Sequence, residues 1–381
     1  MDTKNRLFYI DNIRLVIILL VVIVHLALTY SGPSSWYYTE VRQLGFFSGT
    51  FFSFLYAFLQ AFFMGFLFLI AGYFVPGAYD RKGFGRFLRD RAFRLGIPSL
   101  IYVFIIDPFI EYVLVGRYVK AGQGFLSYYL DNITSLHFLT GTGPLWFAVV
   151  LLVFSIVYAL VRLILGKRQR AAPETKTKPK GWALGVLVII IAALAFLIRT
   201  VFPMNMSYFN MRLCFFAQYI VFFIVGIRAY RQGWFSKLNY KLGSRLLIWS
   251  PLWGTASWGA MMIAFGALTG GDTFLMNGGY TWQSAVYALW ESFTAVAMGI
   301  GFLTVFREKW NSQDRFIGAM SDSAFAVYVF HTPIILAIMI LFGFLQWPPI
   351  LKFLLMIAIC LPVCFAVSYL LKKIPGLKKV I

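Results

Sequence analysis

Long apolar runs alternate with short polar segments along the chain. A helix needs about 20 apolar residues to cross the hydrocarbon core of a bilayer. The pattern predicts an all-α polytopic membrane protein of about ten transmembrane helices, near residues 13–31, 50–75, 97–115, 144–165, 182–202, 213–230, 246–269, 283–306, 323–343 and 350–371. We expect residues 1–381 to form a single integral membrane domain, with a flexible basic linker near 166–181 between two five-helix halves.

The polar segments alternate between basic and nearly uncharged ones, and this alternation predicts the orientation of the helices. Most of the 34 Lys and Arg residues lie in six segments, which are the N-terminus, 76–96, 166–181, 228–245, 307–322 and the C-terminal tail. Basic loops remain in the cytoplasm. Both termini are therefore predicted to be cytoplasmic.

The composition excludes several classes of protein. With 60% hydrophobic and 13% charged residues, the chain is too apolar for a soluble domain or a disordered one. The net charge of +20 does not indicate nucleic-acid binding, because the basic residues lie between apolar runs as topology-setting loops do. Cys214, Cys360 and Cys364 lack the spacing of a zinc site or a disulfide framework. The expected partner is the lipid bilayer, and no metal site is predicted.

Ionisable residues in the first apolar run are the strongest candidates for chemistry, since each is costly to place in lipid. Ten residues without a polar side chain separate Arg14 from His25. In a helix, this spacing puts both side chains on one face, with His25 about 16 Å deeper. Asp11 precedes Arg14 by one turn and is placed to orient its guanidinium by a charge-assisted hydrogen bond.

Two interpretations of these residues remain open. Arg14 could extend to the membrane interface, and His25 could hydrogen-bond a neighbouring helix. Alternatively, His25 is functional, because burial disfavours the charged imidazolium and leaves a neutral ring available as a base.

Two further ionisable residues lie inside apolar runs. His331 precedes Pro333, which frees a backbone carbonyl one turn earlier; His331 could line a cavity at the resulting kink or bond that carbonyl. Glu291 could be a structural pin, or it could contact a buried base or a substrate. Three residues near outer helix ends are predicted to be interfacial anchors, with a role in an outer groove as the alternative: Asp107, Glu111 and Arg199.

The stretch 81–98 is basic and amphipathic. It could contact lipid headgroups. It could also form a cytoplasmic phosphate-binding surface near Arg14, because guanidinium groups bind phosphates through paired hydrogen bonds.

Together these features resemble the acyltransferase-3 family of bacterial membrane O-acyltransferases. The resemblance rests on the arginine, ten residues, histidine signature from Arg14 to His25, on the preceding Tyr9-Ile-Asp-Asn-Ile, and on the segments 62–72, 87–95, 143–147 and 326–333. Segments 218–226 and 290–293, with the ten-helix plan, look most like the glucan biosynthesis protein C branch, which is associated with succinylation of periplasmic glucans.

This resemblance implies a multi-pass protein of the bacterial inner membrane that transfers a succinyl or acetyl group from cytoplasmic acyl-CoA to a hydroxyl of a cell-envelope glycan. Acyl-CoA is then a co-substrate, and no cofactor is bound permanently. The implied roles are a general base for His25, or a covalent acyl carrier in a variant mechanism, and a donor-holding role for Arg14. Arg91 and Arg94 would bind the donor phosphates, and His331 or Trp146 would stabilise the oxyanion.

Other functions remain open at this point. A proton-coupled transporter or flippase of a glycan, lipid or anionic solute could use His25 and Glu291 as a relay. An accessory subunit of a polysaccharide synthase is a third alternative. The acyl group, the acceptor and the oligomeric state, a homo-oligomer included, are left undecided.

Overall fold

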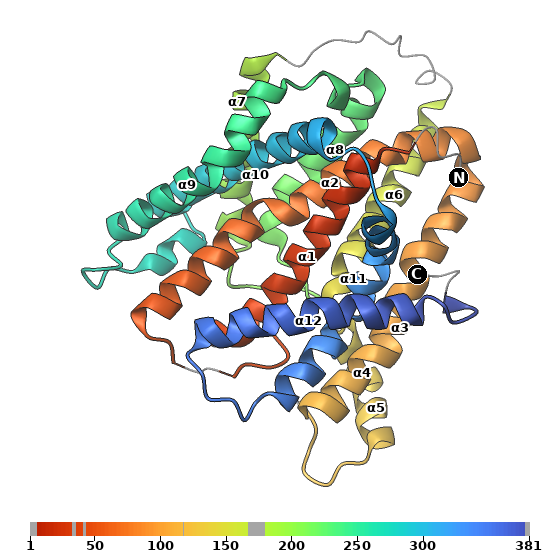
Figure 1. Ribbon diagram of the computed structural model, residues 1–381, viewed down its shortest axis with the longest axis vertical. Coiled ribbons are helices and arrows are strands. Elements are labelled where there is room, and N and C mark those ends of the chain that lie inside the picture. Colours follow the sequence, from red (N-terminus) through yellow and green to blue (C-terminus); the bar gives the residue numbers. More distant parts are fainter. Residues whose placement is uncertain (1–5, 33–35, 41–42, 117, 167–179, 378–381) are drawn as a thin grey trace. The chain divides into compact units, whose positions relative to one another are not determined.

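The computed structural model describes residues 6–32, 36–40, 43–116, 118–166 and 180–377. Its α-helices (Figure 1) are α1 (Phe8–Tyr30), α2 (Phe46–Arg91), α3 (Ile97–Ile101), α4 (Asp107–Phe109), α5 (Phe125–Thr134), α6 (Trp146–Ile164), α7 (Gly181–Val201), α8 (Phe216–Gln232), α9 (Tyr240–Ala264), α10 (Trp282–Lys309), α11 (Arg315–Leu341) and α12 (Pro349–Leu371). Short π-helical turns are η2 (Ala92–Gly96), η3 (Tyr102–Ile106) and η4 (Ile110–Val115). Short 3₁₀ turns include η5 (His137–Thr140) and η6 (Gly143–Leu145). The described residues form no strand beyond an isolated bridge between Tyr208 and Met211.

The predicted all-α membrane fold is confirmed. Within the described ranges, eight helical segments are long and apolar enough to cross a membrane. They are Phe8–Tyr30, Phe46–Val115, Gly143–Ile164, Gly181–Val201, Leu213–Gln232, Trp282–Lys309, Arg315–Leu341 and Pro349–Leu371. The predicted spans near 50–75 and 97–115 lie in one 70-residue segment. The span predicted near 246–269 corresponds to α9, in which polar residues dilute the apolar ones.

The basic segment 76–96 is helical, so the prediction of a loop there is wrong. Helix α2 runs through Pro76 to Arg91, and η2 continues it. The one break is Gly83, whose φ of 72° kinks the helix. This conformation is accessible to glycine at little cost. The chain therefore kinks at Gly83, between two helical stretches.

The chain forms two compact units that do not follow the predicted five-helix halves. The first contains Met1–Arg14, Ala57–Phe87 and Ser155–Asp314, and the second contains Leu15–Tyr56, Leu88–Phe154 and Arg315–Ile381. The predicted linker near 166–181 falls within the range of the first unit. Residues 167–179 of this linker, and the ends of the chain at 1–5 and 378–381, lie outside the described residues.

In the first unit, α10 packs against α7 and α9, and α2 packs against α8. Two glycines allow the close approach of α2 and α8. A Cβ atom on Gly72 would lie 2.2 Å from the backbone oxygen of Phe223, and one on Gly226 would lie 2.2 Å from that of Leu69. Small residues at such contacts let membrane helices associate through backbone packing.

In the second unit, α11 packs against α12, and the turn η6 packs against α11. The Tyr328 hydroxyl on α11 donates to the backbone oxygen of Pro144 in η6. The rings of Phe52 on α2 and Phe353 on α12 meet edge to face at 5.4 Å. All these contacts lie within the second unit, which also contains His25.

We predict that Gly226→Leu lowers the stability of the protein by about 1–3 kcal/mol, because the added side chain must push α8 away from α2. Thermal unfolding in detergent measures this change. The matched control is Gly185→Leu on α7, where an added Cβ has open space around it. Equal melting temperatures for the two variants would contradict close packing at Gly226.

Candidate active site

The start of α1 is fixed in the first unit by one side chain, Asn12. Its Nδ2 donates to the backbone oxygens of Trp310 at 2.8 Å and Ser312 at 3.0 Å. Its Oδ1 accepts from Gln313 Nε2 at 2.8 Å. These bonds all reach the segment after α10, so they hold this end of α1 in one rotation about its axis. The sequence interpretation did not single out Asn12.

Arg14 lies on α1 two residues after this anchor. Its guanidinium is 3.6 Å from Asp11 and lies over the ring of Phe74 at 4.8 Å. Asp11 also accepts from Arg6 Nε at 2.7 Å. The Arg14 side chain remains 42% exposed. The group is thus oriented by a carboxylate and an aromatic ring, with part of its surface open to a ligand.

His25 meets His331 in the second unit. His331 Nε2 lies 3.3 Å from His25 Nδ1, and the two ring centroids are 4.9 Å apart. His25 Nδ1 also lies 2.8 Å from the backbone oxygen of Val21. His331 is fully buried, whereas His25 is partly exposed. Residues 306 positions apart therefore share one site.

The backbone contacts determine which ring nitrogens carry hydrogen. His331 Nδ1 lies 2.9 Å from the oxygen of Tyr328 and 3.1 Å from that of Val327. A carbonyl oxygen only accepts, so Nδ1 of each histidine is the donor, and in the neutral ring Nε2 carries the lone pair. The Nε2 of His331 thus accepts a hydrogen bond from the Nδ1–H of His25. In the His25 ring, Nε2 carries the lone pair and is therefore the basic atom.

His331 does not bond the carbonyl that was expected from the sequence. The ring does bond backbone carbonyls, but they belong to Val327 and Tyr328. The carbonyl that Pro333 frees is that of Val329. The other side of the ring faces His25.

An aromatic residue outside the predicted helices completes the surroundings of His25. The Trp36 ring lies 4.5 Å from the His25 ring. Its segment is held by Glu40, whose backbone N–H donates to Thr29 at 3.0 Å and whose carboxylate accepts from Lys352 Nζ at 2.5 Å. Lys352 is fully buried on α12. A lysine inside a predicted span was the available signal for this pair.

The predicted oxyanion candidate Trp146 begins α6, directly after η6. Its ring contacts that of Phe147 at 6.4 Å, and Phe147 in turn meets Tyr328 at 6.3 Å. The Tyr328 ring stacks on His331 at 6.4 Å. The segment 143–147 therefore supports His331 through Tyr328.

Glu291 lies in the first unit, where it pairs with Arg199. The Arg199 guanidinium donates to the Glu291 carboxylate, and both side chains are buried. The rings of Phe215 and Tyr287 lie within 5.5 Å of the guanidinium. The prediction of Arg199 as an interfacial anchor is wrong, because a buried carboxylate from α10 neutralises it within the protein. Of the alternatives that the sequence left open for Glu291, the structure shows the contact with a buried base, which is Arg199.

Asp107 and Glu111 are also buried rather than interfacial, at 5% and 6% exposure. Tyr37 donates its hydroxyl to Asp107 at 2.5 Å. Burial, and then the neighbouring Tyr102 and Asp107, raise the pKa of the Tyr37 phenol well above its ordinary value. The phenol therefore keeps its proton and remains the donor.

A small surface pocket of about 260 Å³ lies where α2 runs into η2. Its lining residues are Arg89, Asp90, Phe93 and Arg94. Arg94 was predicted to bind donor phosphate, whereas Arg91 is half-buried and does not line this pocket. Arg89 was missed. Arg89 and Phe93 are one helical turn apart, so a helix prediction for this stretch would have placed them on the same face.

The fold and the site define a polytopic membrane protein with a histidine pair among its helices. The family model described as an acyltransferase domain, that of the acyltransferase-3 family, matches residues 7–369. The chain belongs to this family, and it is a membrane acyltransferase by this membership. Comparison with curated proteins and with solved structures gives no match.

We predict that Glu291→Leu destabilises the protein by about 3–5 kcal/mol, because it leaves the buried Arg199 charge uncompensated. The double variant Arg199→Met with Glu291→Leu should recover much of this loss. Thermal unfolding of the two variants in detergent measures the difference. Normal stability with lost activity in the single variant would instead assign Glu291 to the chemistry.

Proposed function

We propose that the protein transfers an acyl group from cytoplasmic acyl-CoA to a hydroxyl of a cell-envelope glycan, with His25 as general base. Family membership supports acyl transfer. The observation that carries the proposal for the site is the contact between His25 Nδ1 and His331 Nε2. It leaves Nε2 of His25 as the atom that takes a proton, at a partly exposed position.

In the proposed reaction, Nε2 of His25 first takes up a proton and later gives it back. The acceptor oxygen attacks the thioester carbonyl carbon while its proton moves to Nε2 of His25. The carbon–sulfur bond then breaks, and the CoA sulfur leaves with the proton from Nε2. While His25 carries both protons, its Nδ1–H is stabilised by the Val21 oxygen and by His331 Nε2. His331 acts here as a positioning residue, in the manner of the third member of a catalytic triad.

The donor is proposed to bind through its phosphates to arginine side chains, for which each of the two units offers its own candidates. Arg14 offers a partly exposed guanidinium that Asp11 and Phe74 orient. Arg89 and Arg94 line a pocket whose volume of about 260 Å³ suits one phosphorylated end of CoA rather than the whole molecule. The resemblance to the glucan biosynthesis protein C branch favours succinyl as the acyl group and a periplasmic glucan as the acceptor.

A proton-coupled transporter or flippase is less well supported. The relay predicted from the sequence would use the Glu291 carboxylate in addition to His25. The Glu291 carboxylate is occupied by Arg199.

We predict that His25→Ala reduces CoA release from succinyl-CoA or acetyl-CoA by about 10²–10⁴-fold, the usual contribution of a general base. His331→Phe should lower kcat about tenfold without changing KM for acyl-CoA, because the charged His25 loses its Nε2 partner. Purified protein in nanodiscs and a thiol-reactive dye give both values. His137→Ala, which alters the third histidine of the chain, is the control. Full activity in His25→Ala would refute the proposed base.

For the donor pocket, we predict that Arg94→Ala raises KM for acyl-CoA about ten- to a hundredfold, the value of one hydrogen bond to a charged group. The kcat should not change, since the pocket does not contact the thioester. Arg86→Ala is the matched control, because Arg86 is exposed on the same helix and does not line the pocket. The same KM in both variants would place donor binding elsewhere.

A further inference from the structure

Buried hydroxyl groups lie directly beside His331 in the second unit. Thr332 follows His331 on α11, and the Tyr102 hydroxyl from η3 interacts with it and with Tyr37. Thr332 and Tyr102 are both fully buried. Within the described residues, neither Thr332 Oγ1 nor Tyr102 Oη has a hydrogen bond of good geometry. The two hydroxyl groups are therefore in contact with each other, and each keeps the capacity for a further hydrogen bond.

A π-helical turn brings a carboxyl group to the same face as Tyr102. The backbone N–H of Asp107 donates to the oxygen of Tyr102, five residues earlier. Residues five apart would lie about 140° apart around a regular α-helix. The wider turn places them nearly one above the other. Asp107 also accepts from Tyr37, and Glu111 follows it one turn later.

Helix α5 extends this group of polar side chains. Its buried residues are Tyr128 and Asn132, one turn apart on one face. Tyr128 lies within electrostatic range of Glu111 and Asp107. Among the described residues, the Tyr128 hydroxyl and both polar atoms of the Asn132 amide have no hydrogen-bond partner.

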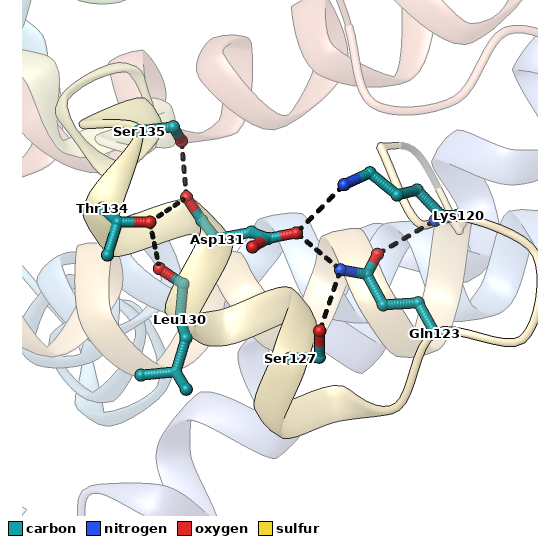
Figure 2. Close-up of polar contacts among 7 residues, drawn as sticks. All are labelled: Lys120, Gln123, Ser127, Leu130, Asp131, Thr134 and Ser135. Carbon is teal, nitrogen blue, oxygen red and sulfur yellow. Dashed lines mark hydrogen bonds and ion pairs between the residues drawn. The ribbon is translucent and has the colours of Figure 1, made fainter.

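An exposed residue of α5, Asp131, is fixed by contacts of its own. Asp131 accepts from Gln123 Nε2 at 2.8 Å and pairs with Lys120 at 3.3 Å (Figure 2). These bonds tie the preceding loop to the exposed face of the helix. They keep Tyr128 and Asn132 turned to the interior, so the unpaired atoms are not a result of a loosely held helix.

Leaving buried polar groups unpaired costs about 1–3 kcal/mol each. A ligand with several hydroxyl groups would satisfy them, since each hydroxyl both donates and accepts. The carboxyl groups of Asp107 and Glu111 add acceptors and disfavour an anionic ligand. The rings of Trp36 and Tyr37, 5.2 Å apart, add apolar surface at the His25 side.

We propose that this cluster, made of Tyr102, Asp107, Tyr128, Asn132 and Thr332, is the acceptor subsite and binds an uncharged sugar unit. The inference rests on the proposed function and deepens it, because it assigns a ligand class and residues to the acceptor side. It places the sugar hydroxyls beside the histidine pair, within the second unit.

The kinetic test uses Thr332→Val and Asn132→Leu, which keep side-chain size and remove hydrogen-bonding groups. With saturating succinyl-CoA and a glucose disaccharide as acceptor, each variant should raise KM for the disaccharide about three- to tenfold, the value of one neutral hydrogen bond. KM for succinyl-CoA should not change, because the cluster does not include the arginines proposed to bind the donor. Thr134→Val, on the exposed face of α5, is the matched control. Unchanged KM for the disaccharide in both variants overturns the proposal.

A second measurement does not depend on acyl transfer. The disaccharide should raise the melting temperature of the wild-type protein in detergent, because it binds only the folded state, and Thr332→Val should weaken this shift. Without sugar, both variants should be as stable as wild type or more stable, since they remove unpaired polar groups. If the cluster instead holds structural water, the variants lose stability and the sugar shift is absent. That outcome overturns the subsite, whereas a sugar shift without acyl transfer overturns only the enzymatic function.

Discussion

A polar group inside a bilayer has to be paired by the protein, because lipid offers no hydrogen bonds. This constraint determines the geometry of the histidine pair. The carbonyls of Val21 on α1 and of Val327 and Tyr328 on α11 take up both Nδ1–H groups. The rings are then held in one tautomer, and the basic nitrogen of His25 follows from that. The chemistry of the site is thus a consequence of how two helices satisfy their own polar side chains.

The same constraint explains the charged pairs. Arg199 with Glu291 in the first unit, and Lys352 with Glu40 in the second, are buried charges that neutralise each other. Such pairs contribute little net stability over apolar residues, but removing one partner is costly. Their role is to fix positions. Lys352 holds the segment that carries Trp36 against His25, so this charged pair sets the surroundings of His25.

The sequence predicts the helices well, because apolar length alone identifies a span, and it singles out Arg14 and His25 through their cost in lipid. It does not predict contacts between distant segments. The pairing of Arg199 with Glu291, and of His25 with Trp36, depends on which helices become neighbours, and apolar periodicity carries no such information. The misinterpretation of 76–96 has a different cause. Its density of basic residues suggested a loop, and treating it as a loop discarded the helical face that relates Arg89 to Phe93.

The separation of Arg14 from His25 is itself a requirement of the proposed reaction. An acyl-CoA carries its phosphates at the nucleotide end, and phosphates cannot enter an apolar interior at acceptable cost. The thioester, by contrast, is uncharged and can reach a base within the membrane. The ten apolar residues between Arg14 and His25 would therefore separate the proposed anion-binding end from the proposed reaction centre, about 16 Å away along one continuous helix. Shortening that distance would bring either the phosphates into lipid or the base into water, where a competing hydrolysis would consume the donor.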